Sequence, residues 1–196
     1  MYTSRTGLVL GFHGTDETIV HNVLNGKNDL KSKNNSYDWL GHGIYFWDNS
    51  PSRAFEWATQ LSQRKGSSIK KPAVIGAIID LGYCLDLLDY KNLAIVKQGY
   101  DMLNTTLEFY QEPLPQNRGK SNDLLLRELD CAVIESIHES AKDNDVQPFD
   151  SVRGVFWEGN PLYPTAGFRE RDHIQICIRN IDCIKGYFLP LSRISS

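Results

Sequence analysis

Short apolar runs alternate along the chain with segments of helical periodicity. An apolar run without alternation is typical of a buried strand, whereas apolar residues three and four positions apart mark one face of a helix. The strands predicted on this basis cover residues 8–12, 43–46, 73–80, 151–157, 173–179 and 182–188. The predicted helices cover residues 16–24, 51–61, 89–109 and 124–141. Together these segments predict a mixed α+β fold.

Individual residues indicate where two of these helices begin or end and which side chains of one strand share a face. Thr15 or Asp16 can cap the first helix, and Gly26 can end it. Pro51 suits the first turn of the second helix. Alternation in the strand at 173–178 predicts that His173, Gln175 and Cys177 share one face, with isoleucines on the other.

Composition places the chain among ordinary globular proteins. Its 196 residues fit one domain better than two, and no segment resembles a linker, so we expect a single domain over residues 1–196. The net charge of -3 argues against a large surface for nucleic acid, although not against contact with one nucleotide or a short strand. A basic stretch, Arg64, Lys65, Lys70 and Lys71, is most simply a solvated loop, and contact with a phosphate is the alternative.

The sequence contains no pattern typical of a signal peptide, a membrane span or a metal site. The polar residues 1–6 and the short apolar run after them are too short for a signal-peptide core or a membrane span, which predicts a cytoplasmic protein without a membrane segment. The four cysteines form no CxxC pair and the histidines show no metal-ligand spacing, so we expect reduced, buried thiols and no metal.

The segment His13-Gly14-Thr15 directly follows the first apolar run. Glycine lets a ligand approach the backbone because no side chain stands in the way. The N–H and C=O of Gly14 could bind a carboxamide, and His13 could bond a ribose hydroxyl. Taken alone, a histidine and glycine at a strand end more often have a structural role.

A second segment, residues 37–47, is dense in aromatic residues and glycine. Phe46 and Trp47 are most simply core residues. Tyr45 differs because its hydroxyl needs a polar partner if it is buried. An aromatic ring beside a glycine-rich strand suits a flat pyridinium ring, which also gains from cation–π attraction.

These segments together resemble a known family. His13-Gly14-Thr15, then Gly41-x-Gly43-Ile44-Tyr45-Phe46, then a helix with Arg53-Ala54 and aromatic residues are similar to the catalytic domain of ADP-ribosyltransferases of the poly(ADP-ribose) polymerase and diphtheria-toxin-like group. The strong part of the resemblance covers residues 8–58, and a weaker part covers 151–188. The chain resembles the small stand-alone bacterial members, which act as toxins or defence proteins. The resemblance implies two packed, mainly antiparallel sheets with flanking helices and an NAD cleft.

The resemblance also implies roles for individual residues. His13 would bond the adenosine-side ribose, Gly14 would hold the nicotinamide carboxamide, and Tyr45 would stack on the nicotinamide ring. The helix that starts near Ser52 would close the pocket, with Arg53 or Glu56 as alternative ligand contacts. We expect valine at Gly14 to block the pocket and leave the fold intact. The implied cofactor-binding residues are His13, Gly14, Thr15, Tyr37, Tyr45, Ser52 and Trp57.

The sequence departs from the family at its third characteristic residue, a glutamate on a late strand that stabilises the cation formed as nicotinamide leaves. Gln175 occupies the corresponding strand, with Glu170 in the preceding loop and Glu158 after the strand at 151–157 as alternatives. The implied catalytic residues are therefore His13, Tyr45, Gln175 and Glu170. A neutral amide can orient the ribose but carries no charge, so we do not expect elongation to a polymer.

The reaction implied is transfer of one ADP-ribose from NAD to a macromolecular acceptor, protein or nucleic acid, with release of nicotinamide. NAD is then a co-substrate, and an antitoxin protein is a conceivable partner. Two alternatives stay open: an NAD glycohydrolase on the same fold, and a catalytically silent module that binds NAD or ADP-ribose. In the family, the loop before the catalytic strand, here residues 159–169, helps to select the acceptor.

Overall fold

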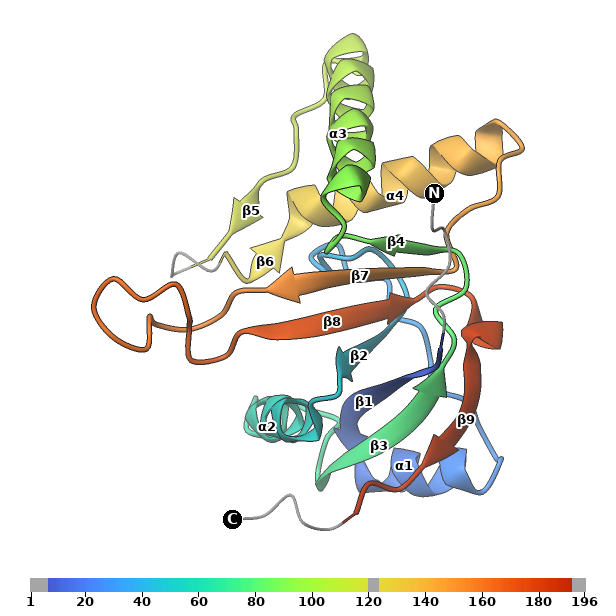
Figure 1. The fold of residues 1–196 in the computed structure, drawn as a ribbon, viewed down its shortest axis with the longest axis vertical. Coiled ribbons are helices and arrows are strands. Elements are labelled where there is room, and N and C mark those ends of the chain that lie inside the picture. Colours follow the sequence, from blue (N-terminus) through green and yellow to red (C-terminus); the bar gives the residue numbers. More distant parts are fainter. Residues whose placement is uncertain (1–6, 120–123, 192–196) are drawn as a thin grey trace.

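The computed structural model describes residues 7–119 and 124–191 and is built around one large sheet (Figure 1). The polar N-terminal residues 1–6, on which part of the localisation prediction rests, lie outside the described residues. In chain order the elements are β1 (Val9–Asp16), α1 (Glu17–Leu24), β2 (Ile44–Asp48), α2 (Pro51–Ser62), β3 (Pro72–Ile79), β4 (Cys84–Asp86), α3 (Tyr90–Tyr110), β5 (Asn117–Arg118), β6 (Leu126–Arg127), α4 (Glu128–Asp143), β7 (Ser151–Phe156), β8 (His173–Ile178), a 3₁₀ turn (Ile181–Cys183) and β9 (Ile184–Phe188).

Seven strands form a mixed sheet in the order β4-β7-β8-β2-β1-β3-β9, and β5 and β6 form a separate two-stranded ribbon. Strands β4 and β7 are parallel, and the other neighbours are antiparallel. The α+β class is confirmed. The strands do not divide into the two packed sheets that we expected, because β1 and β2 are paired through Gly11 opposite Asp48 and Phe12 opposite Trp47. This short pairing joins two halves whose strands run at an angle to each other (Figure 1).

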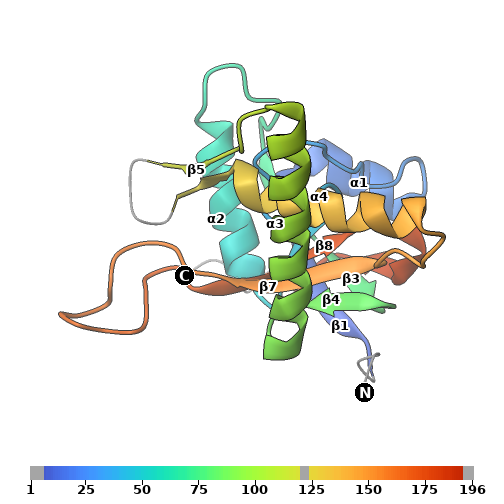
Figure 2. The ribbon, with the colours of Figure 1, turned by 90° about the horizontal axis from the view of Figure 1, so that it is seen from above.

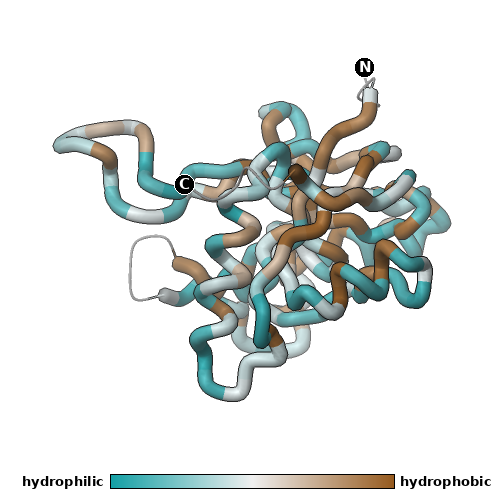
Figure 3. Tube along the Cα trace, turned by 90° about the horizontal axis from the view of Figure 1, so that it is seen from below, coloured by the Kyte–Doolittle hydropathy of each residue, from teal (hydrophilic) through white to brown (hydrophobic). Residues whose placement is uncertain are grey.

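Helices cover both faces of this sheet. On one face, Val20 and Val23 of α1 pack with isoleucines of β3 and β8. On the other face, Ile134 of α4 packs against Val152 and Cys177. The predicted alternation along β8 is confirmed, since its buried isoleucines belong to the first cluster and Cys177 to the second. Hydrophobic stretches accordingly gather in the central strands, and connecting loops are mostly hydrophilic (Figure 3).

Helix α3 packs across α4 on the outside of the molecule (Figure 2). The two helices approach closely at Gly99, where an added Cβ would lie 2.5 Å from Cγ1 of Ile137. The predicted start of the fourth helix is wrong by several residues. Leu126–Arg127 pairs with Asn117–Arg118, and the helix therefore begins at Glu128.

Two further findings concern the thiols and the helices. Of the four free cysteines, Cys131, Cys177 and Cys183 are buried as predicted, whereas Cys84 is partly exposed. Burial raises the pKa of Cys84, Cys131 and Cys183 to about 11. Such thiols are weak nucleophiles at neutral pH. Over the part of the chain that the structure describes, no helix is both long enough and apolar enough to cross a membrane.

Candidate functional site

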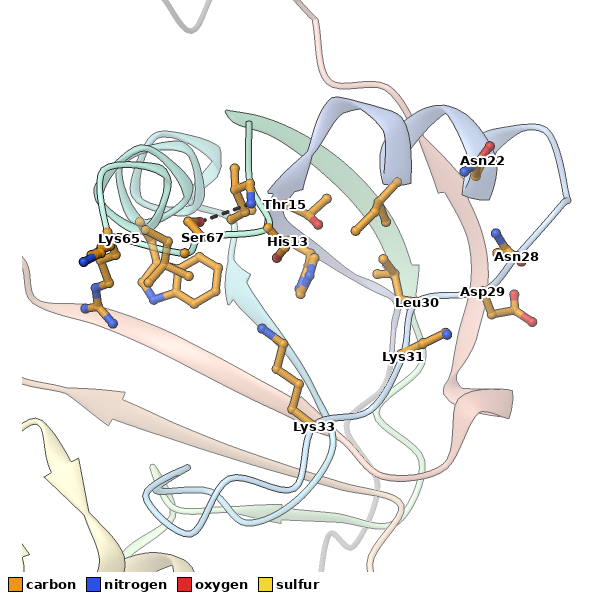
Figure 4. A pocket seen from close by; sticks show the side chains of 18 residues that line it. His13, Thr15, Asn22, Asn28, Asp29, Leu30, Lys31, Lys33, Lys65 and Ser67 are labelled. Atoms are coloured by element: carbon orange, nitrogen blue, oxygen red, sulfur yellow. Dashed lines mark hydrogen bonds between the residues drawn. The ribbon is translucent and has the colours of Figure 1, made fainter. Parts of the chain in front are cut away.

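A cavity of about 640 Å³ lies beside the C-terminal half of β1 (Figure 4). Ligand and cofactor sites typically enclose about 300–1,000 Å³. Its walls come from β1, α1, the end of α2, and the loops at residues 28–33 and 64–69. Its lining includes His13, Gly14, Thr15, Asp29, Lys31, Lys33, Trp57, Arg64 and Lys65.

Asp16 fixes one rim of the cavity. Its Oδ1 accepts from the backbone N–H of Thr18 at 3.0 Å and so caps α1, as the sequence predicted. Its Oδ2 accepts from the backbone N–H groups of Lys70 and Lys71 at 2.7 and 2.9 Å. These hydrogen bonds hold the pKa of Asp16 well below its usual range. The carboxylate therefore joins the basic loop to the start of α1, which places Arg64 and Lys65 at the cavity.

His13 projects into the cavity from β1 (Figure 4). Its Nδ1 lies 2.7 Å from the carbonyl oxygen of Tyr45. A carbonyl can only accept, so Nδ1 carries the proton and Nε2 keeps its lone pair. Burial lowers the pKa of His13 to about 4, and the nearby ammonium of Lys33 acts in the same direction. His13 is therefore a neutral imidazole at pH 7 that can accept a hydrogen bond from a hydroxyl.

This protonation state gives a pH prediction. Between about pH 6 and 8, ligand binding through His13 should not titrate, because its pKa of about 4 lies below that range. Below about pH 6.5 the unfolded chain takes up a proton that folded His13 does not. The contribution of His13 to folding stability should therefore fall from about pH 6.5 towards pH 4. Melting temperatures over this range should decline less steeply in His13→Ala, and an equal decline in both proteins would contradict the assignment.

The cavity concentrates positive charge in a chain that is acidic overall. Four cationic side chains, Lys31, Lys33, Arg64 and Lys65, line it together with one carboxylate, Asp29. Such a cluster suits a phosphate group. Arg64 and Lys65 were signalled in the sequence by the basic stretch that we interpreted as a solvated loop. Lys33 gave no comparable signal because it lies in a polar loop without periodicity.

Four of the predicted site residues line this cavity: His13, Gly14, Thr15 and Trp57. The other five, Tyr37, Tyr45, Ser52, Gln175 and Glu170, lie outside the lining. A ligand confined to this cavity would therefore meet only part of the site that the sequence predicts.

The orientation of Tyr45 explains why it lies outside the cavity that His13 lines. Its hydroxyl donates to the carbonyl oxygen of Gly41 at 2.8 Å and accepts from the N–H of Leu40 at 2.9 Å, which confirms that the buried hydroxyl has polar partners. The ring of its neighbour Phe46 lies 5.8 Å from the ring of His13. Adjacent strand residues point to opposite faces, so the Tyr45 ring faces away from His13 and packs against the cluster on the α4 side. Its stacking role stays a prediction.

Gln175 lies on the same face of the sheet as Tyr45. Its Oε1 accepts from Nε1 of Trp39 at 2.6 Å, which fixes the orientation of the amide. Trp39 in turn packs over Gly154, where an added Cβ would lie 2.7 Å from the indole. The tryptophan therefore has the geometry of a positioning residue for Gln175.

The two glutamates considered as alternatives already have partners. Glu158 is largely buried and pairs with Arg53 at 2.6 Å. Arg53, a possible ligand contact from the sequence, is thus turned towards Glu158. Glu170 is exposed, and its Oε2 accepts from the N–H of Asn160 at 3.1 Å. Neither carboxylate faces His13 across the cavity.

Gly14 is packed more tightly than the sequence suggested. An added Cβ would lie 2.1 Å from the carbonyl oxygen of Ala54 and 3.2 Å from Cβ of Ala58, both on α2. The expectation that valine at Gly14 leaves the fold intact is therefore wrong. The glycine allows close approach of α2 to β1, whatever it does for a ligand.

Comparison with models of known families, with curated proteins and with solved structures gave no match to this chain. Within residues 7–119 and 124–191, no three His, Cys, Asp or Glu side chains gather in a way that could hold a metal ion.

Proposed function

We propose that the cavity binds NAD and that the protein transfers a single ADP-ribose unit from NAD to a macromolecular acceptor. The observation that carries this proposal is the neutral His13, which shares one cavity with the indole of Trp57 and with four cations. NAD presents ribose hydroxyls, a flat cationic ring and a diphosphate. These groups match the imidazole, the indole and the cations in chemistry.

In this arrangement His13 accepts a hydrogen bond from a ribose hydroxyl through Nε2. The cations around the cavity hold the diphosphate, and Trp57 provides an aromatic face for the pyridinium ring. The backbone of Gly14 is the proposed partner of the carboxamide. Thr15 continues the same wall.

The reaction breaks the bond between the ribose C1′ and the nicotinamide nitrogen, and the bonding electrons leave with nicotinamide as a neutral molecule. A nucleophilic oxygen or nitrogen of the acceptor then bonds to C1′ and loses its proton. Positive charge develops on the ribose between these events. No glutamate lines the cavity, so stabilisation of this charge would rely on the diphosphate of NAD itself. Gln175 lies outside the lining, and a role for its amide requires the nicotinamide ribose to extend beyond the cavity towards β8.

The decisive experiment incubates the protein and a cell lysate with NAD labelled in its adenylate phosphate. Label on a macromolecule supports transfer, and its loss after protease or nuclease identifies the acceptor. Free labelled ADP-ribose alone would instead identify a glycohydrolase. Unchanged NAD that nevertheless raises the melting temperature would identify a silent binding module.

His13→Ala tests whether His13 contributes to NAD binding. It should cost about 1 to 3 kcal/mol of NAD binding free energy, the range for removing one partner of a buried polar contact. His21→Ala is the matched control, because His21 is exposed on α1 and lies outside the cavity lining. Equal NAD binding by the two variants would remove His13 from the site.

A further inference from the structure

Lys33 reaches across the cavity from the loop before β2 (Figure 4). Its ammonium nitrogen lies 5.3 Å from the centre of the Trp57 ring, within the range of a cation–π contact. Trp57 is the aromatic residue of the cavity lining, so this contact occupies the aromatic surface offered to a ligand.

The backbone of Lys33 is fixed while its side chain is exposed. Its N–H donates to the carbonyl oxygen of Gly43 at 3.0 Å, and its carbonyl accepts from the N–H of Gly43 at 3.1 Å. The titratable groups that the charge of Lys33 reaches are His13 and Asp38: it adds to the lowering of the His13 pKa by burial, and it opposes the rise that burial causes in the pKa of Asp38. Among residues 7–119 and 124–191 the ammonium has no carboxylate within ion-pair distance. The side chain can therefore change rotamer without breaking an ion pair.

A pyridinium ring and an ammonium compete for the same aromatic face, because both are attracted by the electrons of the indole ring. We propose that Lys33 covers Trp57 in the empty cavity, and that it moves to the diphosphate when a dinucleotide binds. This inference rests on the proposed function. It makes Lys33 a residue that selects for the complete dinucleotide. The cationic ring alone must displace Lys33, whereas NAD displaces it and supplies its new partner.

The two halves of NAD provide separate probes of this exchange. 1-Methylnicotinamide carries the pyridinium cation without a phosphate, and ADP-ribose carries the diphosphate without the pyridinium ring. In Lys33→Met, 1-methylnicotinamide should bind about two- to fivefold more tightly, because the competing cation is gone. ADP-ribose should bind roughly tenfold more weakly, because a charged partner of the diphosphate is lost. Calorimetric or ligand-observed NMR titrations measure both affinities.

Lys31→Met is the matched control. Lys31 is also exposed and also lines the cavity, but it projects away from His13 and Lys33 (Figure 4). Its removal should leave 1-methylnicotinamide binding within about twofold of the unaltered protein, which separates displacement from loss of general positive charge. Lys33→Arg should behave like the unaltered protein, since arginine can make both contacts. Melting temperatures confirm that each variant is folded.

These titrations distinguish failure of the Lys33 exchange from failure of the NAD site itself. If the unaltered protein binds both probes and Lys33→Met shifts both affinities in the same direction, the exchange of Lys33 is overturned and the NAD site is retained. Equal tightening of 1-methylnicotinamide in Lys31→Met also overturns the exchange. If the unaltered protein binds neither probe nor NAD, the proposed function fails, and the inference fails with it.

Discussion

Gly14→Val should destabilise the whole protein by about 3 kcal/mol or more, the upper range for overpacking a filled interior. The added Cβ would lie 2.1 Å from the carbonyl oxygen of Ala54, and the obstacle is helix backbone rather than a movable side chain. Helix α2 would have to separate from β1, which also carries His13 into the cavity. Urea unfolding should show a lower midpoint, and any loss of ligand binding would then follow from unfolding.

Gly186→Val is the matched control for this prediction. Gly186 also lies in a strand, β9, but an added Cβ there meets nothing within 4 Å. Valine suits strands, so the stability of this variant should stay within about 1 kcal/mol of the unaltered protein. A Gly14→Val protein with an unchanged unfolding midpoint would show that α2 can move away from β1 at little cost. Blockage of the cavity is better tested at Trp57 or His13.

Much of the fold could be predicted from local signals. The apolar run at 73–80 became β3 (Pro72–Ile79), and the helix expected at 89–109 became α3 (Tyr90–Tyr110), capped by Asp89. Such elements are specified by their own residues, through burial of a continuous apolar run or through helical spacing and a cap.

Pairing between distant segments produced the differences. The first strand was expected to end at Phe12 because the apolar run ends there. It continues to Asp16, since His13 and Thr15 pair with Ile75 and Ala73 of β3 while their side chains face the cavity. Polar residues that line a site interrupt the hydrophobic pattern without interrupting the strand, and the pattern alone therefore places the boundary too early.

The residues of the candidate site also differ in whether they could be found from the sequence. His13, Gly14 and Thr15 could be singled out because they are consecutive and directly follow an apolar run. The cations could not be placed, because Lys33 reaches the cavity only through its bridge to Gly43, and Arg64 through the anchoring of its loop at Asp16. Neither contact leaves a periodic signal in the sequence.

Gln175→Ala should lower the rate of nicotinamide release by roughly ten- to a thousandfold, the range seen when one oriented polar group is lost from an active site. NAD binding should change little, because Gln175 lies outside the lining of the cavity that holds the cations and His13. The hydrogen bond from Trp39 orients the amide for this role. Single-turnover rates and NAD titrations on the same preparation separate the chemical step from binding.

Gln175→Glu is the sharper variant, because alanine also leaves the N–H of Trp39 without its partner. A carboxylate accepts the same hydrogen bond from Trp39 and adds the negative charge that favours a cationic transition state. We therefore expect Gln175→Glu to match or exceed the rate of the unaltered protein.

Glu170→Ala should reduce transfer more than NAD hydrolysis, since Glu170 is exposed and bonded within its own loop. If Glu170→Ala or a folded Glu158→Ala protein loses both reactions while Gln175→Ala retains them, the catalytic carboxylate comes from outside β8, and the role assigned to Gln175 is wrong.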